Sequence, residues 1–136
     1  TWPPEFYDPP AIEFTIARLE KGPGQAGWWL WYFVRRAESG ADPILIGAGG
    51  YTGPPSHDGS VEIGYSILPD HQRQGYATEA VRGLLARAFT FPEVRSVKAE
   101  TWPARLGSIA VLRKCGFRPA GLGSEPGTIR FELIRT

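Results

Sequence analysis

A short basic loop that contains a glycine lies between an alternating apolar run and an amphipathic segment. It is the part of the chain best suited to chemistry. The apolar run covers residues 61–68 and ends at Pro69, Arg73 and Gly75 lie in the loop, and helical periodicity begins near Tyr76. The first N–H groups of a helix lack partners within the helix, and the helix dipole adds to their attraction for phosphate. The loop therefore predicts an anion site; the alternative is an ordinary basic turn that caps a helix.

The elements that must position this loop follow from the periodicity of the apolar residues. In chain order we expect a helix at 8–19, strands at 28–34, 44–51 and 61–68, a helix that ends at Phe91-Pro92, a strand at 94–101, a helix at 106–114 and strands after 117 and at 128–134. Short turns join the first three strands, which should be antiparallel, and a strand-helix-strand unit should be parallel. The predicted fold class is mixed α/β, a mostly antiparallel sheet with helices on both faces.

The run from Trp28 to Val34 is continuously aromatic and apolar. Such a run favours a strand whose two faces are both covered, so we expect it inside the sheet rather than at an exposed edge. One face of this run could instead line a pocket for an acceptor molecule, although packing in the sheet core is the more common role of such residues.

Composition limits the classes of function. The 136 residues fit one domain, 1–136, and a formal net charge of +1 argues against a dedicated nucleic-acid binder. No apolar run approaches the roughly 20 residues that a membrane span needs. The single cysteine, Cys115, rules out an internal disulfide framework and disfavours a cysteine-based zinc site, and His57 and His71 lack the spacing of a metal pair. We expect no metal and a cytoplasmic location.

Two blocks of the sequence resemble the GNAT family of N-acetyltransferases. The pattern Gln72-x-x-Gly75-x-Ala77 matches the family signature Q/R-x-x-G-x-G/A, and residues 61–69 with 75–80 look like the branch that acetylates ribosomal-protein N-termini. Residues 108–117 are similar to that branch's second block, N-x-x-S-x-x-x-L-x-K-x-G-F. The resemblance covers the chain from about Trp28 onward. It implies the GNAT fold, and because family members generally carry another strand and helix before this point, we expect residues 1–136 to lack them.

The resemblance implies acetyl-CoA as the cosubstrate. The loop and helix start would then hold its pyrophosphate, through Gln72, Arg73, Gln74, Gly75, Tyr76, Ala77 and Thr78. Backbone groups of Ile67 and Leu68 would pair with the pantetheine arm like an added strand, and one N–H would polarise the thioester carbonyl. Arg105 stands where the family usually has asparagine, and we expect it to contact a cofactor phosphate or to face solvent.

Acetyl transfer requires the accepting amine to be neutral. At pH 7, deprotonation costs about 1 kcal/mol for an α-amine and about 4–5 kcal/mol for a lysine-like amine, so a general base matters more for the second. Glu62 and Glu100 are the candidate bases, acting directly or through a water molecule, and Glu62 is favoured because its strand leads into the loop. The alternative for each carboxylate is a solvated or salt-bridged role in the sheet.

The thiolate of CoA, which leaves in the reaction, needs a proton or a hydrogen-bond donor. Many family members use a tyrosine late in the chain, but no tyrosine follows Tyr76 here, and Ser108 of the second block is the natural substitute. The alternative role of Ser108 is to cap the helix that begins near it. Cys115 lies on the apolar face of that helix and is expected to be an inert thiol.

These inferences predict an enzyme that moves acetyl from acetyl-CoA to a primary amine by direct attack. Resemblance to the ribosomal-protein branch favours a protein or peptide α-amine as the acceptor. One alternative is a small amine such as an aminoglycoside or a polyamine, and another is a non-catalytic module that binds acyl-CoA. We expect neither a nucleic-acid nor a membrane partner, and the sequence leaves a homodimer open.

Overall fold

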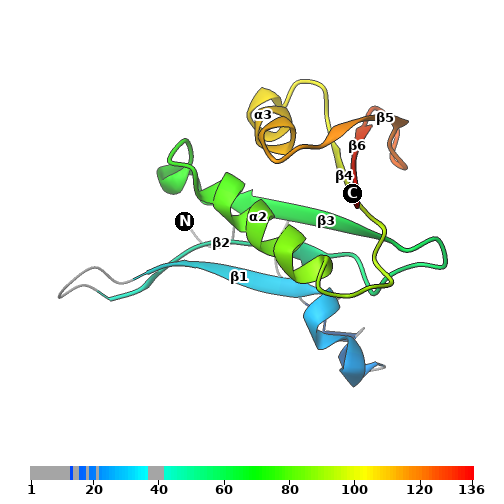
Figure 1. Cartoon of the computed structure of the whole chain (residues 1–136). Helices are drawn as coiled ribbons and strands as arrows, with labels where there is room; N and C mark the ends of the chain where they lie inside the picture. Colours follow the sequence, from blue (N-terminus) through cyan, green and yellow to red (C-terminus); the bar gives the residue numbers. More distant parts are fainter. Residues whose placement is uncertain (1–12, 14–15, 18, 21, 37–41) are drawn as a thin grey trace.

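The computed structural model describes residues 13, 16–17, 19–20, 22–36 and 42–136 (Figure 1). Its elements are η1 (Pro23–Trp28), β1 (Leu30–Arg35), β2 (Ile44–Tyr51), β3 (Ser60–Ile67), η2 (Pro69–His71), α2 (Tyr76–Ala88), β4 (Ser96–Thr101), α3 (Leu106–Lys114), β5 (Arg118–Leu122) and β6 (Ile129–Ile134). Most of the predicted helix at 8–19 lies outside the described residues. Within the described part, no helix is long and apolar enough to cross a membrane.

The strands form one six-stranded sheet in the order β1-β2-β3-β4-β6-β5. The pairs β1–β2, β2–β3, β4–β6 and β6–β5 are antiparallel, and β3–β4 is parallel. Helix α2 makes the crossover between the two parallel strands (Figure 1). The predicted class, a mixed and mostly antiparallel α/β fold, is confirmed.

The prediction that the first strand lies inside the sheet is wrong. Strand β1 ends the sheet order among the described strands, and its side chains Trp31, Tyr32 and Val34 are exposed by 40%, 52% and 52%. Trp28 precedes the strand in η1, where it is buried and packs edge-on against Tyr51 at a centroid distance of 5.0 Å. The continuous apolar run therefore includes one core residue, Trp28, and a strand with exposed side chains. Periodicity cannot distinguish the two, because both are apolar.

Helices α2 and α3 cover the same face of the sheet. The Tyr51 hydroxyl donates to the carbonyl oxygen of Leu84 in α2 at 2.6 Å, and the Tyr65 hydroxyl lies 3.2 Å from Ser108 Oγ in α3. Tyr51 pairs with Ile63, and residues 63 and 65 of one strand point to the same side. The expectation of helices on both faces therefore depends on the segment before Gly22, which lies largely outside the described residues.

The hydrophobic core fills the space between these helices and the sheet. Its most buried large side chains are Phe131, Leu112, Val81, Val94 and Val97. Helix α2 contributes Val81, Leu84, Leu85 and Ala88 to this core, and α3 contributes Leu112, with Ile109 and Cys115 packed against it. Gly116 ends α3 at φ 94°, a left-handed conformation that favours glycine. The core fixes α2 and α3 against β3 and β4.

Strands β3 and β4 are paired over only part of their length. Their register runs from Ser60 with Ser96 to Ile63 with Ala99. Beyond that point β3 stays paired with β2 as far as Ile67, and β4 stays paired with β6 as far as Thr101. The two strands therefore separate in the middle of the sheet, and Figure 1 shows them diverging.

Candidate active site

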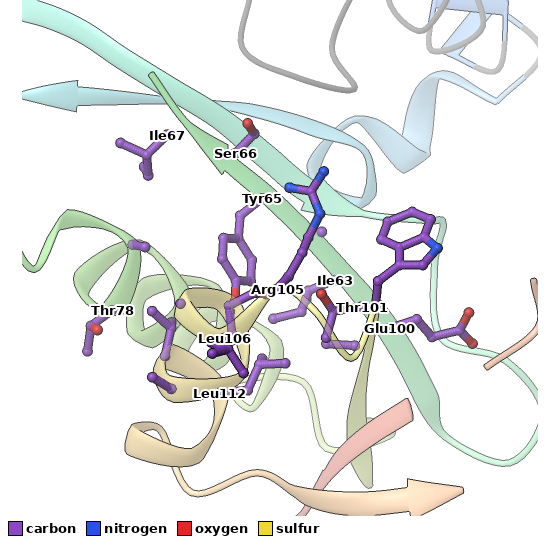
Figure 2. Close-up of a pocket in the computed structure, with 18 of the residues that line it drawn as sticks. Ile63, Tyr65, Ser66, Ile67, Thr78, Glu100, Thr101, Arg105, Leu106 and Leu112 are labelled. Atoms are coloured by element: carbon purple, nitrogen blue, oxygen red, sulfur yellow. The ribbon is translucent and has the colours of Figure 1, made fainter. Parts of the chain in front are cut away.

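A cavity of about 970 Å³ opens where β3 and β4 separate (Figure 2). Its walls come from β3, the start of α2, the end of β4, the first two turns of α3 and the loop before β6. It brings together most of the site residues predicted from sequence, namely Glu62, Ile67, Gln72, Arg73, Gly75, Ala77, Thr78, Glu100, Arg105 and Ser108. Leu68, Gln74 and Tyr76 do not line it.

The edge of β3 that β4 leaves presents backbone groups to the cavity. At one end Leu68 donates its N–H to the carbonyl oxygen of Ile46 at 2.8 Å, and at the other end the carbonyl of Glu62 accepts a 3.0 Å bond from the loop after β2. Antiparallel pairing alternates along a strand, so the N–H and C=O groups of Tyr65 and Ile67 point away from β2, toward the gap. Ile67 fits the predicted backbone contact, whereas the N–H of Leu68 is already engaged by β2.

The loop after β3 presents a further set of N–H groups. The Gln72 side chain donates to the carbonyl oxygen of Ile67 at 2.8 Å and holds the loop against the strand. Arg73 and Gly75 both have positive φ angles, 62° and 85°. The first helical bond of α2 runs from Glu79 N–H to the carbonyl oxygen of Gly75, which leaves the N–H groups of residues 76–78 at the open end of the helix.

Space above Gly75 is consistent with an anion at this helix start. A Cβ atom on Gly75 would meet no other atom within 4 Å. The neighbouring side chains point elsewhere, because Gln74 donates to the carbonyl oxygen of Asp70 at 3.3 Å and the Tyr76 ring lies 6.4 Å from that of His71. Only the backbone of residues 74 and 76 is therefore placed to contribute, and the exposed guanidinium of Arg73 adds positive charge.

The two candidate bases have different surroundings. Burial raises the pKa of Glu62, and the nearby charge of Glu100 raises it further. Burial acts in the same direction on Glu100, but a 2.7 Å ion pair with Arg130 and hydrogen bonds from the backbone and hydroxyl of Ser124 lower the pKa of Glu100 below its usual value. Glu62 is thus a more basic carboxylate beside the cavity, and Glu100 holds Arg130 and the loop at Ser124.

Ser108 is not the cap of its helix. Arg105 is the N-cap residue of α3, and Ser108 lies in the first turn of the helix with its Oγ atom 3.2 Å from the Tyr65 hydroxyl. Tyr65 also lines the cavity (Figure 2), and burial raises the pKa of its phenol. Sequence reasoning missed Tyr65 because it searched for a tyrosine late in the chain, although the alternation along β3 already places residue 65 on the same face as Ile63.

Two further side chains from the connection between β4 and α3 line the cavity. Arg105 is exposed, lines the cavity, and holds its guanidinium carbon 5.6 Å from the centre of the Trp102 ring. Trp102 lines the same cavity, which sequence reasoning did not foresee. Cys115 packs against the core with its sulfur 3.9 Å from the Thr78 carbonyl oxygen, and burial raises the pKa of its thiol, which disfavours the reactive thiolate.

The arrangement can bind an anionic, amide-containing chain and deprotonate a neighbouring group. The N–H groups at the helix start can bind a phosphate, the unpaired edge of β3 can pair with amides, and the Glu62 carboxylate can accept a proton. Among the residues that the structure describes, no group of three or more His, Cys, Asp or Glu side chains is arranged to hold a metal ion.

Comparison with known proteins points to one family. Residues 1–118 match the family model described as an acetyltransferase (GNAT) domain. Among curated proteins, the chain is 31% identical over 117 residues to the uncharacterized N-acetyltransferase YjdG of Bacillus subtilis, over 85% of this chain and 66% of that protein. It is 32% identical over 78 residues to the uncharacterized N-acetyltransferase p20 of Bacillus licheniformis, over 57% of this chain and 44% of that protein. The matched part of the chain thus covers two thirds or less of the length of these relatives.

Solved structures share the fold. A variant of the spermidine N-acetyltransferase SpeG from Vibrio cholerae superimposes with a TM-score of 0.68 at 19% identity, over 90% of this chain and 75% of that one. The aminoglycoside acetyltransferase AAC(6')-Ib, solved with coenzyme A, gives a TM-score of 0.63 at 22% identity, over 81% of this chain and 69% of that one.

Proposed function

We propose, since the chain belongs to the acetyltransferase (GNAT) domain family, that it moves acetyl from acetyl-CoA to a primary amine by direct attack. The observation that carries this proposal is the separation of β3 from β4 beside the start of α2. One opening offers a strand edge, an anion-binding helix start and a half-buried carboxylate, the three features that a direct transfer from acetyl-CoA needs.

The residues present fit acetyl-CoA. The N–H groups at the start of α2, with Arg73, would hold the pyrophosphate, and the backbone of Tyr65 would pair with an amide of the pantetheine arm. The bound cosubstrate supplies an activated acetyl thioester. An N–H of this chain, such as that of Ile67, would polarise its carbonyl, and one such donor typically lowers the barrier by about 3 kcal/mol.

Two side chains have proposed roles in the transfer. Glu62 takes the proton that the amine loses, because its raised pKa makes it the better base of the two carboxylates. Ser108 donates a hydrogen bond to the leaving sulfur from the first turn of α3. Glu100 keeps a structural role through Arg130, and its negative charge raises the proton affinity of Glu62.

The acceptor is proposed to be a cationic amine that loses its proton in the cavity. Glu62 and Glu125 line the cavity together with Glu100, which Arg130 neutralises, so two carboxylates there remain to attract a cationic amine. Resemblance to the ribosomal-protein branch favours a peptide α-amine, which costs only about 1 kcal/mol to deprotonate at pH 7. A polyamine or an aminoglycoside is the alternative acceptor, and both occur in the names of proteins with this fold.

A two-step measurement tests the proposal. First, acetyl-CoA at one hundred times its dissociation constant should stabilise the protein by about 2.7 kcal/mol, a rise in melting temperature of several degrees. Second, release of the CoA thiol should be followed with a free-amine peptide, the same peptide with a blocked N-terminus, spermidine and an aminoglycoside. Stabilisation without thiol release from any acceptor would indicate a binding module instead. Absence of stabilisation at millimolar acetyl-CoA would overturn the proposal as a whole.

A further inference from the structure

We propose that the Tyr65 hydroxyl is a positioning group for Ser108: it donates to Ser108 Oγ, so that the serine's own proton points at the sulfur that leaves. This inference rests on the proposed function. It gives a residue of β3 an indirect part in stabilising the thiolate that leaves.

The 3.2 Å contact allows either hydroxyl to donate, and the proposed role of Ser108 requires Tyr65 to be the donor. The Tyr65 oxygen lies 3.2 Å from Ser108 Oγ and 3.4 Å from the Ser108 carbonyl oxygen. A phenol and an alcohol have one proton each. If the Tyr65 hydroxyl donates to Ser108 Oγ, the Ser108 hydroxyl can donate its own proton to another acceptor in the cavity, which would be the sulfur that leaves. Each hydrogen bond in such a chain polarises the next, so a thiolate at its end would strengthen both.

The surroundings keep the phenol protonated. Tyr65 is partly buried between β3 and α3, and burial raises the pKa of its phenol. It therefore remains a donor instead of ionising. Its backbone faces the same cavity at the edge of β3, so the strand that holds the cosubstrate also sets the position of the hydroxyl. Ser108 is fixed in turn by the first turn of α3.

The reaction balances without a proton from either hydroxyl. The cationic amine first gives one proton to solvent by way of Glu62. The neutral nitrogen then forms a bond to the acetyl carbon, the carbon–sulfur bond breaks, and sulfur leaves with the electron pair as a thiolate. Glu62 takes the second proton, which the nitrogen loses as the amide forms. Tyr65 and Ser108 stabilise the thiolate only by hydrogen bonding and keep their protons, so they return unchanged to the start of the next cycle.

The first test measures the pKa of the thiol of bound CoA and needs no knowledge of the acceptor. CoA itself is the probe, and the ultraviolet absorbance of the thiolate is followed against pH on the wild type, Tyr65→Phe and Ser108→Ala. Hydrogen bonds to charged groups are worth enough to lower a thiol pKa by about one unit or more. We expect a lowered thiol pKa in the wild type and a return toward the value of free CoA in both variants.

The matched control is Tyr51→Phe. Tyr51 also makes a buried hydrogen bond from its hydroxyl to a helical carbonyl, that of Leu84 at 2.6 Å, but it does not line the cavity. Tyr51→Phe should lower the melting temperature and leave the thiol pKa of bound CoA unchanged. A purely structural role of Tyr65 would make Tyr65→Phe behave in the same way, and that result would overturn the inference.

A double-variant cycle on turnover tests the link between the two hydroxyls. Tyr65→Phe should lower kcat roughly tenfold with the KM for acetyl-CoA unchanged, Ser108→Ala should lower kcat at least as much, and the double variant should equal Ser108→Ala. Losses that multiply would show independent action and overturn the inference. Failure of CoA to bind the wild type would overturn the proposed function, and this inference with it; binding with an ordinary thiol pKa would overturn the inference alone.

Discussion

Replacing Glu62 by glutamine should remove the base without destabilising the fold. Burial and the charge of Glu100 raise the pKa of Glu62 in the folded protein. A carboxyl whose pKa is raised on folding contributes stability below its unfolded pKa, and that contribution is lost as the pH rises through the folded value. At pH 7 the charged Glu62 therefore costs stability, and Glu62→Gln should leave the melting temperature unchanged or higher.

Although the melting temperature should not fall, the turnover rate of Glu62→Gln should be lower than that of the wild type. A positioned general base contributes typically 10²- to 10⁴-fold, so Glu62→Gln should lower kcat by about that factor with a lysine-like amine. An α-amine needs less help because its deprotonation costs only about 1 kcal/mol at pH 7, and the loss should be smaller. In the wild type, activity should fall on acidification at a pH above the range of an ordinary glutamate, and that limb of the profile should disappear in Glu62→Gln.

Glu100→Gln is the matched control on the same face of the sheet. Its side chain is 10% exposed, its carboxylate bonds Arg130 at 2.7 Å as well as Ser124, and these bonds lower its pKa despite burial. The stability it contributes is present above the unfolded pKa near 4.5 and is lost as the pH falls through the folded value. Breaking the pair should cost about 1–3 kcal/mol at pH 7.

The two variants separate the roles in one pair of assays, urea unfolding and thiol release. We expect Glu62→Gln to be slow and stable, and Glu100→Gln to be destabilised with a smaller loss of kcat at temperatures where it is folded. If Glu100→Gln shows the larger loss of kcat while Glu62→Gln keeps the full rate, the assignment of the base from these surroundings is wrong.

Three further variants test other parts of the structure. Gly75→Ala places a methyl group at φ 85° in the open space above the loop. It should lower the free energy of unfolding by about 1 kcal/mol. The free energy of acetyl-CoA binding, measured by titration calorimetry, should fall by more than that. Leu112→Ala empties a site that is 1% exposed between α3 and the sheet, and urea unfolding should show a loss of about 2–5 kcal/mol. Tyr51→Phe should lose about 1 kcal/mol by the same measurement.

Local patterns were sufficient to predict the elements that hold the site. The apolar stripe of α2 and the alternation of β3 specify their own secondary structure, and Gly75 between them marks the turn that a helix start needs. For the same reason most of the predicted cofactor residues lie around one cavity: they are neighbours in the chain, and the connection from β3 to α2 is short.

Long-range pairing could not be predicted in this way. The exposure of Trp31 depends on where β1 lies in the sheet, and an apolar run carries no information on that point. The contact of Tyr65 with Ser108 joins residues 43 positions apart. Likewise, the different roles of Glu62 and Glu100 come from Arg130, a partner that β6 brings to β4.

The glycines of β2 allow this strand to lie close against β3 beside the loop. A Cβ atom on Gly47 would clash with the carbonyl oxygen of Ser66, and one on Gly49 would come within 2.5 Å of the carbonyl oxygen of Gly64. The backbones of β2 and β3 therefore approach one another more closely than side chains at these positions would permit. This approach keeps β3 against β2 up to Ile67, past the point where β4 has turned away with β6. One side of β3 is thus held by a glycine-rich strand, and its other side is left unpaired where β4 departs, which is the edge on which the proposed chemistry depends.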